Sequence, residues 1–476
     1  MNKIIIDYIR NVLLILLPVV LFFSYHPVIT IGESETMNLE LSLPEIWLVL
    51  FSLASLPKIR SLIKYYHWKK IALAAIVPLY FTISLIWSGN KLRTLLTAGM
   101  VWLVAFSILN IIYSIKLSKS EKKSPFGGLL NIILTTLLVS AVVMSIYCLV
   151  QCILDVAGVS RDTTLLCQGC VTTAFGFPHP NGFAIEPQFM GNLLIAPVLL
   201  CYYLICTFDK QKLFKHKSSL IAVTMFLSAT LFFTFSRGAI YAMILGFALE
   251  MILLKKSKKM KVASTSIVSS LGMVLLAFAI SLCAQGIFAE VGPTNDTFYS
   301  GIAKSIHQLS LGKIDLREVQ DNSEQISTKT EQTEQSSPQP DQENNNESDF
   351  SGYVEESTNR RLDLNHYAFD TWKSNPQYIF VGAGLGSAGV AMKEKFPNDI
   401  NAKEIVQNEY YSILLETGLI GCGLILVVAF LVIKNIRKAS PLFISLVFSY
   451  LLTLMFFSGL PNALQIYLLP ALLFFV

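Results

Sequence analysis

Long apolar stretches, separated by shorter polar segments, recur from one end of the chain to the other. Each holds about twenty residues with few charges, which is the length an α-helix needs to cross the hydrocarbon core of a bilayer. The stretches are 8–25, 44–63, 70–88, 92–115, 128–154, 182–206, 218–236, 238–254, 262–286, 408–433, 441–457 and 462–476. The pattern predicts an all-α polytopic membrane protein with about twelve transmembrane helices.

Composition agrees with this fold class. Of the 476 residues, 53% are hydrophobic and only 14% are charged, whereas a soluble domain carries about 25% charged residues. A soluble fold is therefore excluded. The net charge of +5 is too small and too unevenly spread to indicate nucleic acid as a partner.

The connectors between the stretches alternate in charge. Basic segments run from Lys58 to Lys70, Lys116 to Lys123, Lys210 to Lys217, Lys255 to Lys261 and Lys434 to Lys438, and the connectors between them carry few positive charges. Because basic loops stay in the cytoplasm, both termini are predicted to be cytoplasmic.

One long connector on the opposite side divides the chain into three regions. Helices one to nine occupy residues 1–286, the extracytoplasmic loop residues 287–407, and helices ten to twelve residues 408–476. Residues 320–349 contain almost nothing able to build a core and are predicted to be disordered, as an insertion or as a binding arm.

After this tract, the chain is predicted to be structured again. From Arg361 to Trp372, apolar residues recur at helical spacing, at Leu364, Tyr367, Ala368 and Trp372, until Asn375-Pro376 stops the run. We expect a short amphipathic helix on the outer surface. The glycines of VGAGLGS (381–387) are interpreted as a tight outer loop, because a membrane helix bundle offers no parallel sheet for a nucleotide site.

Two polar clusters enter apolar stretches. Residues 218–254 are just long enough for two crossings, so the chain must reverse at Ser236-Arg237-Gly238, with Gly238 permitting the turn. Arg237 then either snorkels to the interface or binds an anion. Asn408, Ser412 and Glu416, beside Gln407 and Tyr411, form a stripe that faces either a cavity or a neighbouring helix.

A third group precedes the sixth stretch. His179, before Pro180, is either a loop residue or a catalyst, and Glu186 enters the apolar span beside Pro187. Cys167 and Cys170 have the spacing of a disulfide or of half a metal site, but no second Cys or His pair accompanies them. We predict no metal site.

The SRGA hairpin, the Arg-helix-Pro-glycine loop and the QNEYYSILLETGLIG entry to a late helix occur in this order. Together they resemble the O-antigen ligase and O-antigen polymerase (Wzy-like) family of bacterial membrane glycosyltransferases, over roughly residues 180–435. The resemblance implies that Arg237 and Arg361 hold the pyrophosphate of a polyprenol-linked glycan. Arg360, adjacent to Arg361, is an alternative.

The sequence departs from the family at one position. Ligases usually carry His-Asn where this chain has Gln407-Asn408, and a glutamine orients by hydrogen bonds but cannot act as a base. Either little base assistance is needed, or Glu186, Glu409 or Glu416 accepts the proton. The substitution favours a polymerase over a ligase.

The resemblance thus implies an enzyme without a cofactor in the bacterial cytoplasmic membrane, which polymerises polyprenyl-pyrophosphate-linked repeat units into a surface polysaccharide at the outer leaflet. The catalytic group is Arg237, Arg361, Gln407, Asn408 and Glu416; the substrate-binding group is Arg360, Tyr411, Glu186 and His179. Partners are the lipid-linked donor and acceptor, membrane lipids, and chain-length regulator and flippase proteins.

Two alternatives remain open. One is ligase-type transfer to a lipid core, a teichoic-type polymer or a protein, which differs only in the acceptor. The other is a transporter or flippase for the same lipid-linked sugars. Against the transporter, the halves show no convincing internal repeat and no matched pair of broken helices.

Overall fold

The computed structural model describes residues 3–34, 36–120, 128–159, 164–208, 213–256, 264–294, 296–311, 313–314, 316, 348–436, 439–458 and 463–476. The longer helices are α1 (Lys3–Phe22), α2 (Leu43–Ser55), α3 (Ile59–Ile83), α4 (Lys91–Ser120), α5 (Leu129–Val156), α8 (Pro187–Cys206), α9 (Lys217–Phe233), α10 (Arg237–Lys256), α11 (Ser264–Val291), α12 (Phe298–Leu309), α14 (Ser348–Ser374), α17 (Glu409–Ile436), α18 (Pro441–Thr453) and α19 (Leu464–Leu473). Three short helices are α7 (Thr172–Phe175), α15 (Pro376–Phe380) and α16 (Ala388–Lys395).

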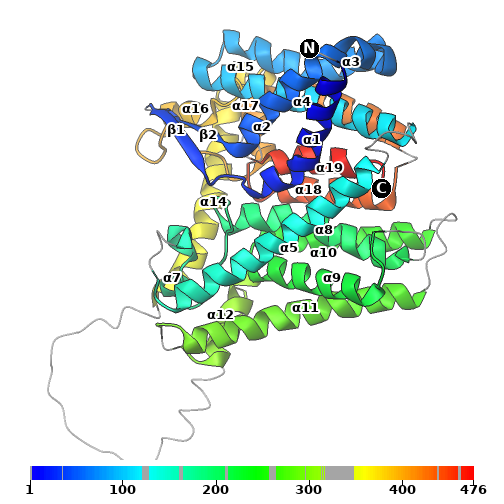
Figure 1. The fold of residues 1–476 in the computed structure, drawn as a ribbon. Helices are drawn as coiled ribbons and strands as arrows, with labels where there is room; N and C mark the ends of the chain where they lie inside the picture. Colours follow the sequence, from blue (N-terminus) through cyan, green and yellow to red (C-terminus); the bar gives the residue numbers. More distant parts are fainter. Residues whose placement is uncertain are drawn as a thin grey trace, which may run out of the picture.

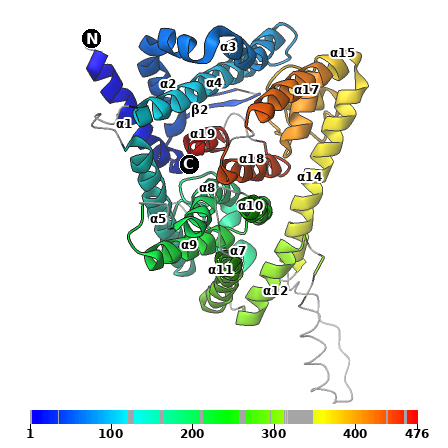
Figure 2. The same cartoon turned by 90° about the vertical axis from the view of Figure 1, so that its right-hand side faces the viewer.

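These helices form two neighbouring groups (Figures 1 and 2). One group contains α5 and α8 to α12, the other contains α2 to α4 and α15 to α17, and α18 and α19 lie between them. Helix α8 is central, because it contacts α9, α10, α18 and α19 and every residue from Met190 to Ile205 is buried. The bundle thus has an apolar helix at its core rather than a polar channel.

The structure confirms a multi-pass membrane protein but not the count of about twelve spans. Among the described residues, eight segments are long and apolar enough to cross a membrane: Ile5–Phe22, Leu43–Ile86, Lys91–Ser118, Leu129–Val156, Pro187–Cys206, Arg237–Lys256, Ser264–Val291 and Glu409–Leu431. Helices α9, α18 and α19 are apolar but shorter. All twelve predicted ranges fall on helix.

Two local predictions are wrong. The basic segment from Lys58 to Lys70 is not a loop but mostly helical, and it belongs to α3, whose helical geometry is interrupted only at His67 (φ 59°). The fold is also not purely α-helical. Strands β1 (Val28–Glu33) and β2 (Asn38–Ser42) pair as an antiparallel hairpin between α1 and α2, where the sequence was interpreted only as a connector.

The hairpin is joined to the region expected to be the large outer loop. The Lys403 ammonium donates to Glu33 (2.5 Å) and to the Asn38 side chain (3.0 Å). The positive charge of Lys403 lowers the pKa of the Glu33 carboxyl, first through this hydrogen bond. The strands therefore brace the chain that leads into α17.

The predicted amphipathic helix exists but is much longer than expected, because α14 extends over Ser348–Ser374. Leu364 and Ala368 are buried and Tyr367 and Trp372 pack against them, as their spacing predicts. Of the tract predicted to be disordered, residues 320–347 lie outside the described residues. The last two, 348 and 349, are helical.

A small core holds this outer region together. Leu364 and Ala368 of α14 pack with Met392 of α16, with Val406 in the segment before α17 and with Leu415 of α17. The predicted stop at Asn375-Pro376 is confirmed, because α14 ends at Ser374 and the Asn375 side chain caps α15. Helix α14 is therefore held across one end of the bundle, between α12 and α15 (Figure 2).

Candidate functional site

A cavity of about 850 Å³ opens at one end of the helix bundle. Its wall is built where α8, α10 and α17 begin and where α9 and α18 end, with α12 and α14 closing the sides. The opposite ends of these helices carry Lys217 on α9, Lys255 and Lys256 on α10, and Lys434 on α17. The cavity and the basic connectors therefore lie at opposite ends of the bundle.

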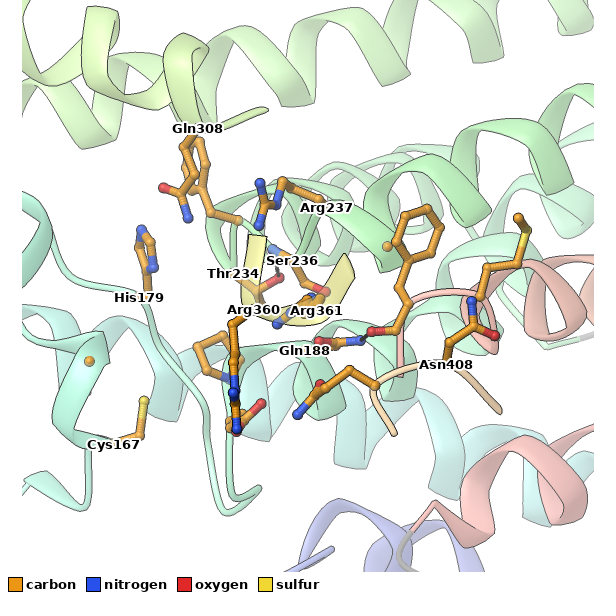
Figure 3. A pocket seen from close by; sticks show the side chains of 18 of the residues that line it. Cys167, His179, Gln188, Thr234, Ser236, Arg237, Gln308, Arg360, Arg361 and Asn408 are labelled. Carbon is orange, nitrogen blue, oxygen red and sulfur yellow. Dashed lines mark hydrogen bonds between the residues drawn. The ribbon is translucent and has the colours of Figure 1, made fainter. Parts of the chain in front are cut away.

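Seven of the nine residues singled out from the sequence line this cavity: His179, Glu186, Arg237, Arg360, Arg361, Gln407 and Asn408. They come from four separate parts of the chain. Figure 3 shows Arg237 and Arg361 between His179 on one side and Asn408 on the other. Glu416 and Tyr411 are not part of the cavity wall.

Arg237 is the first residue of α10, and the chain reverses just before it. The reversal occupies Thr234–Ser236 and depends on Phe235, whose φ of 49° lies in the left-handed region. The prediction that Gly238 permits the turn is wrong, because Gly238 is already helical. Its role is close packing, since a Cβ there would lie 2.8 Å from the Cβ of Phe456.

The two adjacent arginines of α14 have different surroundings. Arg361 lies close enough to Arg237 for the two positive charges to repel each other. Arg360 instead donates to the Glu404 carboxylate (3.3 Å) and to the Asp399 carbonyl (3.4 Å). Arg360 thus ties α14 to the loop before α17, and Arg361 is the one whose charge acts on Arg237.

Gln407 and Asn408 lie at the start of α17. The Asn408 side chain accepts a hydrogen bond from the Tyr410 N–H (3.0 Å), which satisfies one of the free amides of the first helical turn. The Glu409 N–H donates to the Leu454 carbonyl (2.9 Å) at the end of α18. These contacts fix the approach of Gln407 and Asn408 to the cavity.

Glu416 and Tyr411, which do not line the cavity, make contacts elsewhere. The Glu416 carboxylate accepts from the Ala388 N–H (3.3 Å), and its carbonyl accepts from the Gly384 N–H (2.9 Å). Glu416 therefore supports the glycine loop, whose residues from Gly382 to Ser387 are buried. The Tyr411 ring packs edge-on against Phe369, with centroids 6.3 Å apart. Glu409, the third possible proton acceptor, is buried and accepts from the Ser458 hydroxyl (2.7 Å).

The loop before α8 places His179 and Glu186 in the wall. The backbone N–H of His179 donates to the Cys170 carbonyl (2.9 Å). The imidazole ring stacks on the Phe235 ring, with centroids 5.6 Å apart. Burial, followed by the positive charge of Arg237, lowers the pKa of His179 to about 3. The imidazole is therefore neutral at physiological pH.

Glu186 does not enter the apolar span. It is the residue immediately before α8, with extended backbone, and its side chain is exposed to the cavity. The preceding cysteines are joined, since Cys167 and Cys170 form a disulfide with Cα atoms 5.1 Å apart. This excludes half a metal site for that pair, and the disulfide itself forms part of the cavity wall.

Several wall residues could not be found from the sequence. Gln188, Gln308 and Asn365 all line the cavity. Each is a single neutral polar residue without a partner at motif spacing, and Gln308 lies on α12, which falls within the predicted outer loop. Only the tertiary structure brings the start of α8 and the helices α12 and α14 to one cavity.

Comparison with known proteins agrees with the motifs. Residues 221–426 match a family model described as O-antigen ligase. The resemblance inferred from the sequence is confirmed over this range, which includes Arg237, Arg361, Gln407 and Asn408 but not His179 or Glu186. Neither a curated protein nor a solved structure gives a significant match.

Proposed function

We propose that this multi-pass membrane protein, whose residues 221–426 match the O-antigen ligase family, polymerises polyprenyl-pyrophosphate-linked oligosaccharide repeat units into a surface polysaccharide. The observation that carries the proposal is the meeting of Arg237 and Arg361 in one cavity, although they come from α10 and α14. Two like charges side by side are unfavourable unless an anion lies between them. The planar fork of arginine suits the oxygens of a diphosphate.

The distribution of charge supports an outer-leaflet reaction. The helix ends opposite the cavity carry the basic residues, and basic ends stay in the cytoplasm. The cavity would then face outwards from the bacterial cytoplasmic membrane, with both termini inside. A lipid-linked donor would reach it from the outer leaflet.

The reaction is a substitution at the anomeric carbon of the donor sugar. The acceptor hydroxyl oxygen forms the new bond, the bond to the diphosphate oxygen breaks, and the diphosphate leaves with the electron pair. Arg237 and Arg361 would stabilise the charge that develops on the diphosphate. Gln407 and Asn408 would orient the acceptor, and Glu186 is the carboxylate in the wall best placed to accept its proton, because Glu404 is paired with Arg360.

The second candidate is ligase-type transfer, which the description of the matching family favours. It uses the same donor and the same arginines, and differs in moving the glycan to a lipid core, a teichoic-type polymer or a protein. Gln407, in place of a histidine, favours the polymerase. Chain-length regulator and flippase proteins are proposed partners in either case.

The test is to reconstitute the purified protein in liposomes with lipid-linked repeat units extracted from the host. We expect a ladder of products that grows by one repeat unit, with one polyprenyl pyrophosphate released for each bond formed. Transfer seen only after a different acceptor is added would indicate a ligase. Movement of intact lipid-linked units across the bilayer without bond formation would indicate a carrier.

The same assay tests the acceptor side. The Gln407→His variant is expected to keep or exceed wild-type activity, because histidine orients the hydroxyl and also accepts its proton. Its rate should fall below about pH 6.5, where an ordinary histidine is protonated, and the wild type should lack this dependence. The exposed Gln377→His is the control. Loss of activity in a well-folded Gln407→His variant would refute the acceptor role.

A further inference from the structure

Gln308 is a polar residue of the cavity wall that the proposed chemistry does not use. It lies in the last turn of α12, and its side chain reaches the cavity. The residue is 9% exposed, and its amide oxygen has no hydrogen-bond partner among the described residues. Buried polar groups are nearly always paired, so an unpaired amide in a cavity wall indicates a ligand that pairs with it.

The neighbours of Gln308 place this amide next to the proposed diphosphate site. Figure 3 shows the Gln308 and His179 side chains on one side of Arg237 and Asn408 on the other, and all four residues line the same cavity. The positive charge of Arg237 contributes to lowering the pKa of His179, so these two side chains lie near each other. A group bound by Gln308 would therefore adjoin the arginines.

Two other amides in the wall are already engaged in structural hydrogen bonds, whereas the Asn365 oxygen, on α14, also has no partner among the described residues. The Asn408 oxygen accepts from the Tyr410 N–H (3.0 Å), and the Gln188 amide donates to the Phe456 carbonyl (3.0 Å). These two side chains hold the helix ends in place. Gln308 has no such structural hydrogen bond among the described residues, which separates it from the amides that only support the fold.

The chemistry of this side of the cavity suits a sugar better than a phosphate. An amide both donates and accepts hydrogen bonds, as does a neutral imidazole, and a hydroxyl group needs both. Phosphate oxygens only accept and are best served by cations. Phe235, stacked on His179, adds an aromatic surface to the same wall, against which the apolar face of a sugar ring can pack.

We propose that Gln308 and His179 form the subsite for the sugar attached directly to the donor diphosphate, with Gln308 bonding one of its hydroxyl or acetamido groups. This inference rests on the proposed function, since it places the sugar beside the diphosphate held by Arg237 and Arg361. Gln308 is then a residue that determines which lipid-linked glycan is used.

The experiment measures binding of two probes by purified protein in detergent. One probe is polyprenyl pyrophosphate alone, and the other is the same lipid carrying the oligosaccharide extracted from the host. Gln308→Met keeps the length of the side chain and removes its hydrogen bonds. It is expected to weaken binding of the glycan-bearing lipid about five-fold, the effect of one neutral hydrogen bond, and to leave binding of the bare lipid unchanged.

Three further variants make the outcome decisive. The exposed Gln377→Met carries the same chemical change outside the cavity and should bind both probes normally. Gln308→Asn withdraws the amide from the cavity and should show the same selective loss, which covers the case that Gln308→Met does not fold. Arg237→Lys should weaken binding of both probes.

The results distinguish a failure of the proposed sugar subsite from a failure of the proposed function. If Gln308→Met and Gln308→Asn leave both affinities unchanged, or weaken both equally, the sugar subsite is wrong. If Arg237→Lys binds bare polyprenyl pyrophosphate normally, the proposal that Arg237 and Arg361 bind the diphosphate is wrong. A selective loss in the Gln308 variants would then still place a sugar at α12.

Discussion

Replacing Arg237 or, separately, Arg361 with lysine is expected to lower polymer synthesis at least about 100-fold, the effect of removing one preorganised group that stabilises developing negative charge. Lysine keeps the positive charge but loses the planar fork that binds two phosphate oxygens at once. The measurement is the length and amount of polymer in cells and in the reconstituted assay, at matched protein levels.

The control for this prediction is Arg60→Lys. Arg60 is exposed on α3, within the basic segment from Lys58 to Lys70 and outside the cavity, so this variant should make normal polymer. If Arg237→Lys and Arg361→Lys both gave polymer of normal length and yield, the two arginines would not grip a diphosphate. The case for the enzyme would then lose its main support.

The Gly382→Ala variant is expected to be destabilised by about 2–5 kcal/mol, because two unfavourable terms add. Gly382 has a φ of +80°, which costs other residues roughly 1–2 kcal/mol. A Cβ there would come within 2.2 Å of the Glu416 carbonyl oxygen, and overpacking of this kind typically costs about 1–3 kcal/mol. The measurement is thermal unfolding of the purified protein in detergent.

Activity should fall together with stability in Gly382→Ala. The glycine loop and the first turns of α17 are joined by the hydrogen bonds of Gly384 and Ala383 to the carbonyls of Glu416 and Leu415 (both 2.9 Å). A displaced loop would therefore shift the helix that begins beside Asn408. If Gly382→Ala unfolded at the wild-type temperature and kept full activity, the glycine loop would not be what positions the start of α17.

Gly423→Ala is the matched control on α17. No atom lies within 4 Å of a Cβ built at Gly423, and its backbone is not in the left-handed region. Alanine favours helix over glycine by up to about 1 kcal/mol, so this variant should be as stable as the wild type or slightly more so. The pair separates the effect of an added methyl group from the effect of its position.

Local pattern was sufficient to place the long apolar helices, but not the length of α14 or the presence of α12. Hydrophobicity over about twenty residues reflects the thickness of a bilayer, and it placed all twelve predicted ranges on helix. Asn375-Pro376 stopped a helix for a reason that also acts locally, since proline restricts the residue before it. Arg237 was recognisable as a candidate because a charge inside an apolar hairpin is costly.

Predictions failed where neighbours distant in the sequence decide the outcome. Gly238 is required by the approach of Phe456 from the end of α18 and not by its own backbone. Glu416 was assigned to the site because it shares a helical face with Asn408, but the glycine loop covers that part of the face. Helical periodicity says which residues share a face and not what the face meets.

The sequence by itself determined that the protein crosses the membrane several times and where its long apolar helices lie, because hydrophobicity over a short window reflects the thickness of the bilayer. It also singled out Arg237 and the adjacent pair Arg360 and Arg361 as candidates. Only the tertiary structure decided that Arg361 rather than Arg360 meets Arg237, and that Gln308 joins them in one wall. These pairings arise because α12, which packs on α11, and α14, which packs on α17, both reach the cavity where α8 and α10 begin, and contacts between such distant segments leave no periodic trace in the chain.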